Sequence, residues 1–97
     1  MIEGLNIEKL QLAAERLRAM AHPMRIAILE LLSKADELNV TDIYTSLSIE
    51  QATASHHLNV LRNKGILESR RDGKKIYYSL STKSLSEVLS CINKCGK

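Results

Sequence analysis

The chain has 97 residues, of which 44% are hydrophobic and 26% are charged, and its formal net charge is +3. This length accommodates one domain with a single core, and the composition excludes an intrinsically disordered chain. No apolar run approaches the roughly 18–20 residues that span a bilayer, and the first residues lack the basic and apolar stretches of a secretory signal. Two cysteines near the end are too few for a disulfide framework, so we expect a cytoplasmic protein without a membrane partner.

The positive charge is concentrated in one part of the chain. Residues 1–48 carry a net charge of −2, whereas residues 49–83 hold seven basic and three acidic residues, a net charge of +4. A basic stretch of this kind favours a polyanionic partner, most commonly nucleic acid. The alternative is a solvated basic face without a partner, and charge alone does not separate the two.

The first predicted helix covers residues 6–21, with Asn6 as its N-cap. One stripe of apolar residues follows helical spacing: Ile7, Leu10, Ala14, Leu17 and Ala21. Leu5, Leu12 and Met20 fall off this stripe, which indicates contact with two surfaces, the core and a partner subunit. A core of this size without Phe or Trp is marginal alone, which also favours a dimer.

A second helix is predicted over about 23–35, because Pro23 suits the first position of a helix. Its residues are apolar nearly all round, so this helix should be central in the fold. Residues 38–40 are short, alternating and bounded by polar residues, and could form a brief edge strand.

A helix-turn-helix is predicted over residues 41–64. Thr41 can cap a short first helix, 42–47, and a tight connection follows at 48–49. The second helix is longer, and Gly65 provides its C-terminal stop.

A β-hairpin, the predicted wing, covers residues 66–80. Asp72 and Gly73 separate two strand-like runs, 66–71 and 74–80. An Asp-Gly pair in this position is the strongest short-range signal of a hairpin.

The last predicted helix covers residues 84–95, where Ser84 and Glu87 form a capping box ahead of an apolar stripe. The order helix, helix, short strand, helix, helix, hairpin, helix is that of a winged helix-turn-helix, mainly α with a small β-hairpin wing. We therefore expect one domain over residues 1–97, and this architecture points to double-stranded DNA as the partner.

The second helix of the helix-turn-helix has two unlike faces. Ala54, Leu58 and Leu61 share the inward face, with His57 at its margin, and small polar residues share the outward face. Small polar residues allow a helix to enter a major groove and meet base edges. Solvated helices usually carry Lys and Glu there, so we favour DNA contact over a merely solvated face. The candidate DNA-binding residues of this helix are Gln51, Ala52, Ser55, His56, Asn59 and Arg62.

Four cations cluster near the tip of the predicted wing, and they are Arg70, Arg71, Lys74 and Lys75. Mobile cationic side chains suit phosphates, so a wing can bind beside the groove without reading sequence. The same charges can protect an edge hairpin from aggregation, and both roles are compatible. Tyr77 and Tyr78 alternate in direction, so one of them should pack on the core.

We find no pattern of catalytic residues. His56 and His57 are adjacent on a helix and diverge by about 100°, so they cannot easily chelate one metal or act as a base and nucleophile. The chain has no His-Glu-x-x-His, no glycine-rich phosphate loop and no Cys-x-x-Cys. We do not expect an enzyme.

Three segments, residues 17–29, 51–67 and 70–80, resemble the first helix junction, the recognition helix and the wing of the ArsR/SmtB family of repressors. The resemblance implies a homodimer joined by the first and last helices, which binds an inverted-repeat operator and blocks transcription. The family usually has Gly in the turn and Ser or Thr as the cap of the recognition helix, where this chain has Ser48 and Glu50. Glu50 suits the helix dipole but should repel a nearby phosphate.

Metal-sensing members of that family hold ions at two sites whose ligands are mostly missing here. Asn39 and Thr41 stand at the positions of a Cys-x-Cys pair. Thr82 and Ser84 stand at the first two positions of the site on the last helix, where only Cys95 matches a ligand position. We therefore predict no cofactor and no zinc, nickel or cobalt at either site.

Cys91 and Cys95 are the remaining candidates for sensing, as sensor thiols four residues apart on the last predicted helix. Two thiolates at this spacing can share a soft metal ion such as Cu(I), or a trivalent arsenic, with a third ligand from elsewhere. They can also form persulfides or intersubunit disulfides. The alternative is two small residues with no sensing role.

A competing function is a winged-helix module that binds protein and has lost sequence-specific DNA reading. Glu50 and the modest net charge of +3 favour this alternative. A shallow salt dependence of DNA binding without sequence preference would support it.

Overall fold

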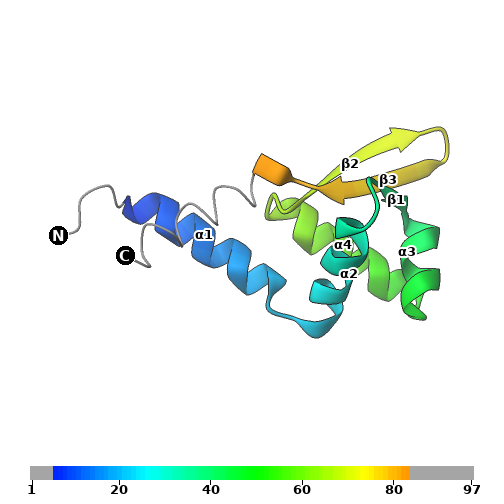
Figure 1. Cartoon of the computed structure of the whole chain (residues 1–97), viewed down its shortest axis with the longest axis horizontal. Helices are drawn as coiled ribbons and strands as arrows, with labels where there is room; N and C mark the ends of the chain where they lie inside the picture. The colour runs from blue at the N-terminus through cyan, green and yellow to red at the C-terminus, as the bar shows by residue number, and fades with distance from the viewer. Residues whose placement is uncertain (1–5, 84–97) are drawn as a thin grey trace.

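The computed structural model describes residues 6–83, which form four helices and three short strands. The elements are, in chain order, α1 (Ile7–Met20), α2 (Pro23–Ser33), β1 (Leu38–Asn39), α3 (Val40–Leu47), α4 (Gln51–Asn63), β2 (Leu67–Asp72) and β3 (Lys75–Leu80). The fold is mostly helical with a small antiparallel sheet (Figure 1), which confirms the predicted fold class. The predicted last helix, 84–95, lies outside the described residues.

Helix α2 holds the centre of the molecule, as predicted from its apolar composition. It contacts α1, α3, α4 and β3, and Ile28 and Leu32 on it are buried. The other members of the core cluster come from every neighbouring element; they are Ala19, Ile43, Leu58, Leu61, Ile66, Leu67 and Tyr78. Tyr78 is thus the tyrosine of the pair that packs on the core, while Tyr77 is half-buried.

The sheet has the strand order β1-β3-β2, and both pairings are antiparallel. The turn of the hairpin lies one residue later than predicted, because Asp72 pairs with Lys75 inside the ladder. Gly73 takes the first of the two turn positions with φ +64°, a conformation that glycine adopts without a steric penalty and that type II′ turns require there.

Helix α3 begins earlier than predicted and has a different cap. Asn39, not Thr41, is the N-cap, and its side-chain oxygen accepts a hydrogen bond from the backbone N–H of Asp42 at 2.8 Å. Asn caps at least as well as Thr, and Asn39 is already extended as the last residue of β1. Thr41 lies within the first turn of the helix.

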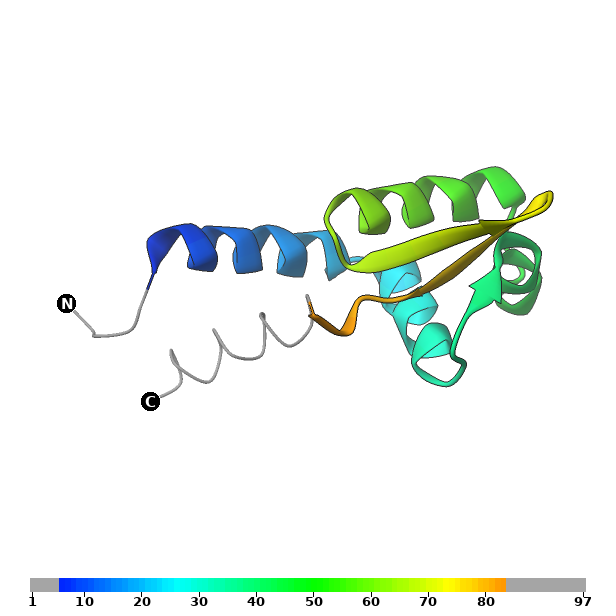
Figure 2. The same ribbon diagram turned by 90° about the horizontal axis from the view of Figure 1, so that it is seen from above.

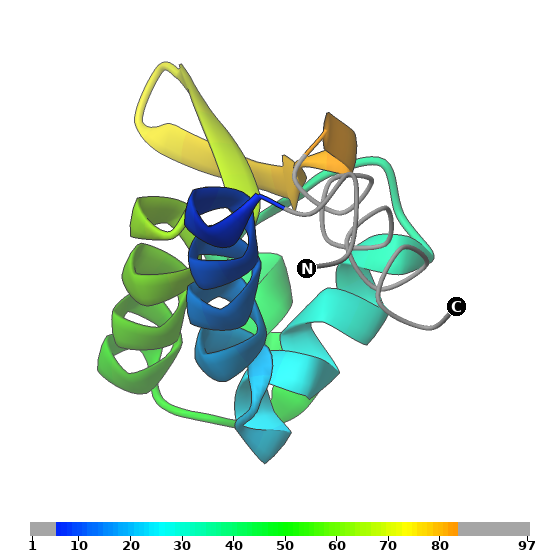
Figure 3. The ribbon, with the colours of Figure 1, turned by 90° about the vertical axis from the view of Figure 1, so that its left-hand side faces the viewer.

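Helix α1 contacts both α4 and α2 (Figure 3). Seen from above, the hairpin runs along α4, and its tip lies at the end where α4 begins, whereas α1 occupies the opposite end (Figure 2). Within residues 6–83, none of the helices has the length and apolar character needed to cross a membrane.

Helix α1 uses its apolar residues in an unexpected way. The large residues Ile7, Leu12 and Leu17 are 65%, 42% and 43% exposed, whereas the buried residues of the helix are two alanines, Ala13 and Ala19. On the predicted stripe, Ile7, Leu17 and Ala21 are exposed and Leu10 and Ala14 are half-buried. The stripe is therefore only partly covered by this chain, and Met20, off the stripe, packs against the core cluster.

Candidate nucleic-acid interface

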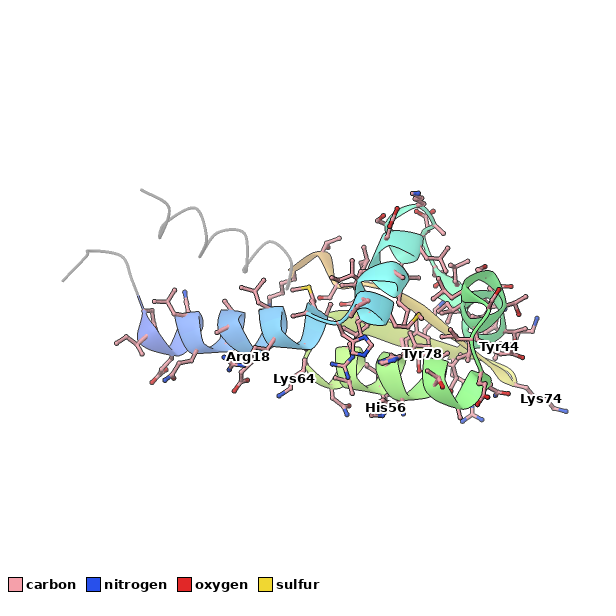
Figure 4. All side chains as sticks on the ribbon, turned by 90° about the horizontal axis from the view of Figure 1, so that it is seen from below. Arg18, Tyr44, His56, Lys64, Lys74 and Tyr78 are labelled. Carbon is pink, nitrogen blue, oxygen red and sulfur yellow. The ribbon has the colours of Figure 1, made fainter. Side chains whose placement is uncertain are left out.

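The outer face of α4 presents the predicted set of small polar side chains. Ala54, Leu58 and Leu61 are buried, and His57 lies deeper than the expected margin, with only 7% of its surface exposed. On the opposite side, Ser55 is half-buried and the exposed residues are Gln51, Ala52, His56, Asn59, Arg62 and Asn63. Figure 4 shows His56 and Lys64 projecting from the outer side of this helix, away from Tyr78.

The start of α4 carries an acidic residue that the helix does not use as a side-chain cap. Glu50 is the N-cap in an extended conformation, and its side chain makes no capping hydrogen bond. Glu50 is exposed, so it places a negative charge at the start of α4, where it would repel an approaching anion.

A cleft of about 380 Å³ lies between the first half of α4 and strand β3 of the wing, including the turn residue Lys74. Gln51, Ser55 and Asn59, which follow one another at intervals of four, line its α4 side, and Lys74 and Lys75 line its wing side. The remaining lining residues are Asn39, Val40, Thr41, Ile76 and Tyr78. Within the described part of the chain no acidic side chain lines this cleft, so its chemistry suits an anion with several hydrogen-bond acceptors.

Sequence reasoning missed Thr41 and Asn39 as neighbours of this cleft. Both stand at the start of α3, and they reach the wing because β1 pairs with β3 at Leu38–Tyr78 and Asn39–Tyr77. A helix-turn-helix pattern does not predict the pairing of β1 with β3. No local signal in the sequence therefore places Thr41 in the same cleft as Lys74.

Arg70 differs from the other three cations of the wing. Its Nε lies 2.9 and 3.1 Å from the two carboxylate oxygens of Glu37, and its Nη2 donates to the same carboxylate. The guanidinium also lies over the ring of Tyr77, with 4.7 Å between Cζ and the ring centroid. The hydrogen bond from Arg70 holds the pKa of Glu37 below its usual value, and Glu37 raises the pKa of Arg70. Much of the charge of Arg70 is thus compensated within the protein.

The other wing cations are open to a ligand. Lys74 is exposed at the second position of the turn, and Lys75 is exposed at the start of β3. Figure 4 shows Lys74 at the far end of the wing. Arg71 is exposed, and its Nε donates a hydrogen bond to the carbonyl oxygen of Gly73 at 3.3 Å.

The arrangement combines two kinds of surface on one side of the molecule. Helix α4 offers mainly uncharged donors and acceptors, which can meet base edges, and the wing offers exposed cations, which attract phosphates without reading sequence. Among residues 6–83, no group of three or more His, Cys, Asp or Glu side chains could hold a metal ion. Cys91 and Cys95 lie outside the described residues.

Comparisons with known proteins agree with this geometry. A family model described as "Bacterial regulatory protein, arsR family" matches residues 22–69. The transcriptional repressor PagR of Bacillus anthracis is 41% identical over 92 residues, which cover 95% of this chain and 89% of PagR. The nodulation protein NolR of Rhizobium meliloti is 35% identical over 86 residues, covering 89% of this chain and 70% of NolR.

Solved structures give the same result. The crystal structure of PagR of Bacillus anthracis superposes with a TM-score of 0.75 at 40% identity and covers 88% of this chain and 98% of that chain. The crystal structure of NolR from Sinorhizobium fredii superposes with a TM-score of 0.72 at 33% identity, covering 96% of this chain and 95% of the other.

Proposed function

Because the chain belongs to the arsR family of bacterial regulatory proteins, and is therefore a DNA-binding transcriptional regulator rather than an enzyme, we propose that it acts as a homodimeric repressor on an inverted-repeat operator in the cytoplasm. Its relative PagR is named a transcriptional repressor. The observation that carries the proposal is the mainly uncharged polar face of α4 beside the cationic wing, across a cleft that no acidic side chain of residues 6–83 lines.

We assign different work to the two halves of this surface. Helix α4 enters the major groove and reads base edges, because most of its outer side chains are small or polar and uncharged. The residues are Gln51, Ala52, Ser55, His56, Asn59 and Arg62. The wing binds phosphates through Arg71, Lys74 and Lys75. Arg70 contributes less of its charge, since Glu37 already binds it.

The homodimer accounts for the exposed face of α1. Ile7 and Leu17, which belong to one stripe of α1, expose large apolar side chains, and exposed apolar side chains on one side of a helix mark a surface that another molecule covers. We assign α1 (predicted as 6–21), together with the predicted helix over 84–95, to the interface between two copies. The two recognition helices would then enter successive major grooves about 34 Å apart.

Cys91 and Cys95 are our candidates for the site that relieves repression. Oxidation of their thiols, persulfide formation or a soft metal or arsenic ion would act on the proposed interface helix. We assign no resident cofactor to the protein.

The first experiment is fluorescence anisotropy of the protein on the DNA upstream of its own gene, with a scrambled duplex of equal length as control, with and without reductant. We expect tight, sequence-selective binding that weakens steeply with salt, because phosphate contacts release counterions. Loss of binding on oxidation would identify the cysteines as the switch, and no change would leave repression without thiol control. Equal binding to both duplexes with a shallow salt dependence would contradict the proposed repressor.

Substitutions on α4 test the division of labour within the same assay. Ser55→Ala or His56→Ala should reduce the preference for the operator over the scrambled duplex, because each removes a candidate base contact, worth about 1–3 kcal/mol of discrimination. An equal loss of affinity for both duplexes would show that these residues contact the DNA backbone and not the bases.

A further inference from the structure

Helix α4 is joined to the rest of the molecule by a polar link on the side that faces away from the proposed DNA surface. His57 on this helix is buried, and its Nδ1 accepts a hydrogen bond from Nε of Arg25 on α2 at 3.1 Å. The same guanidinium donates from Nη1 to the carbonyl oxygen of Ala19 at 3.1 Å. Ala19 lies in the last turn of α1, so one side chain connects α1 with the middle of α4.

The link joins the two functional ends of the molecule. Its α1 end belongs to the helix whose exposed apolar face we assign to the partner copy, and its α4 end is one residue from His56 on the proposed DNA-reading face. The rings of His56 and His57 are 5.5 Å apart between centroids. A small movement of His57 therefore changes how the outer side chains of α4 are presented.

The link requires one protonation state of His57. Because Nδ1 accepts the hydrogen bond from Arg25, the imidazole is neutral and carries its proton on Nε2. A protonated imidazole has donors on both nitrogens, so an N–H would face the N–H of Arg25, and two positive charges would meet across about 3 Å. Protonation must therefore break the link.

The surroundings of His57 keep it neutral near pH 7. Burial lowers its pKa below the ordinary value of 6.5, and the nearby charges of His22, Arg25 and His56 lower it further. His22 and Arg25 approach from the α2 side, with 4.7 Å between the ring centroids of His22 and His57, and His56 is on α4 itself. From α1, the group that enters the link is the carbonyl oxygen of Ala19.

Resting on the proposed DNA-reading role of α4, we propose that Arg25 and His57 are positioning residues of the recognition helix: neutral His57 holds α4 to the end of α1 through the Arg25 guanidinium, and its protonation releases α4 and weakens operator binding. Acid would then weaken DNA binding. An added positive charge near DNA should by itself strengthen binding. The sign of the pH dependence therefore separates this link from a general electrostatic effect.

The test compares DNA affinity at about pH 8 and about pH 5.5, the range over which histidines titrate, at constant ionic strength. The probe is a labelled duplex that the protein itself has selected from a random-sequence library at the higher pH. We expect wild-type affinity to fall roughly tenfold on acidification, the factor that loss of one charge-assisted hydrogen bond can produce. His57→Gln should keep its affinity at low pH, because the amide oxygen accepts from Arg25 and does not titrate.

Two matched control variants each replace one of the other imidazoles of the cluster. His22→Asn keeps an N-cap for α2, where the imidazole Nδ1 of His22 now accepts from the N–H of Met24 at 3.1 Å. His56→Gln removes the imidazole on the DNA face. Both variants should retain the acid-induced loss, and its disappearance in either one, or its persistence in His57→Gln, would overturn the assignment to His57.

A second measurement needs no DNA and separates this inference from the proposed function. Nitrogen NMR of the histidines should show neutral His57 with its proton on Nε2. The amide signals of Ala19 and Met20 should shift with the same pH midpoint as His57. Arg25→Lys keeps the charge but loses the planar fork, so in this variant the amide signals of Ala19 and Met20 should no longer follow the titration of His57. If Arg25→Lys does not fold, Arg25→Gln replaces it in the same measurement.

The outcomes distinguish the two hypotheses. Failure to select any duplex at the higher pH would contradict the sequence-specific repressor, whatever His57 does. Selective binding with no movement of the α1 signals during the titration of His57 would overturn the link and leave the repressor intact.

Discussion

Helices α1 and α4 are similar in length but place their apolar residues in opposite ways. Helix α4 buries Leu58 and Leu61 in the core of its own chain and exposes short polar side chains. Helix α1 buries only alanines and exposes Ile7 and Leu17. The comparison shows that α4 buries its large apolar residues within its own chain and exposes polar ones, whereas α1 exposes large apolar side chains, which a further surface would cover in our proposal.

The largest expected effect that tests this comparison comes from shortening one large side chain on each helix to alanine. Leu58→Ala removes a fully buried side chain, and we expect a loss of about 2–5 kcal/mol in the free energy of unfolding. Leu17→Ala should cost much less at protein concentrations where the chain is monomeric, because Leu17 is already 43% exposed there. Urea denaturation at several protein concentrations measures both, and equal losses in the monomer would show that α1 is not a free face.

A charge on α1 should disrupt the dimer without unfolding the chain. Leu17→Glu places a carboxylate in the proposed apolar interface, and burial of an unpaired charge is costly, so we expect dimer affinity to fall by at least roughly tenfold. Gln11→Glu adds the same charge to the same helix at an exposed polar position and serves as the control. Sedimentation equilibrium reports the result; an unchanged dimer in Leu17→Glu would assign this face to another partner.

Substitution of the wing lysines should change the salt dependence of DNA binding more than substitution of Arg70. The double variant Lys74→Ala, Lys75→Ala should weaken binding to operator and scrambled DNA alike and lower the slope of log affinity against log salt by roughly 2, about 1 for each phosphate that the wing no longer neutralises. Arg70→Ala should lower the slope less, because Glu37 already pairs with Arg70. Equal slopes for the single variants Arg70→Ala and Lys74→Ala would show that the pair with Glu37 opens on DNA.

Stability should also depend on pH through His57. The pKa of His57 in the folded protein is below its ordinary value of 6.5, so as the pH falls through about 6.5 the unfolded chain takes up a proton before the folded one does. The free energy of unfolding should therefore fall with acid in this window. Thermal unfolding of the wild type and of His57→Gln, scanned across this range, should show a flatter profile for the variant; parallel profiles would place the proton uptake elsewhere.

Local periodicity was sufficient to predict most of the fold. The spacing of Ala54, Leu58 and Leu61 predicts which side of α4 is buried, and the structure confirms it. The same kind of pattern could not say which body covers the stripe on α1, because a helical period records apolar faces and not their partners. The turn of the wing and the cap of α3 were each wrong by one or two residues, since Asp72 can pair in a strand and Asn39 caps as well as Thr41.

The parts of the site that sequence reasoning missed depend on contacts between distant residues. Arg70 and Glu37 are 33 residues apart, and Arg25 and His57 are 32 apart. No pattern within one helix or one hairpin indicates such a pair. The sequence therefore predicts which residue types face the ligand, but only the fold shows which of their charges are already paired.

The smallest expected effect concerns the turn that leads into α4. Ser48 ends α3 in the left-handed conformation, with φ 55° and ψ 44°, which costs a residue with a side chain about 1–2 kcal/mol. Ser48→Gly removes this strain but adds about 0.5–1 kcal/mol of chain entropy on folding, so a net gain in stability of up to about 1 kcal/mol remains. Its matched control is Ser46→Gly, two residues earlier inside α3, which should lose about 0.5–1 kcal/mol instead. Because the buried face of α4 fixes its position, Ser48→Gly should leave DNA affinity unchanged. A gain in stability accompanied by a loss of affinity would mean that the strained turn, and not the core alone, sets the angle of the recognition helix.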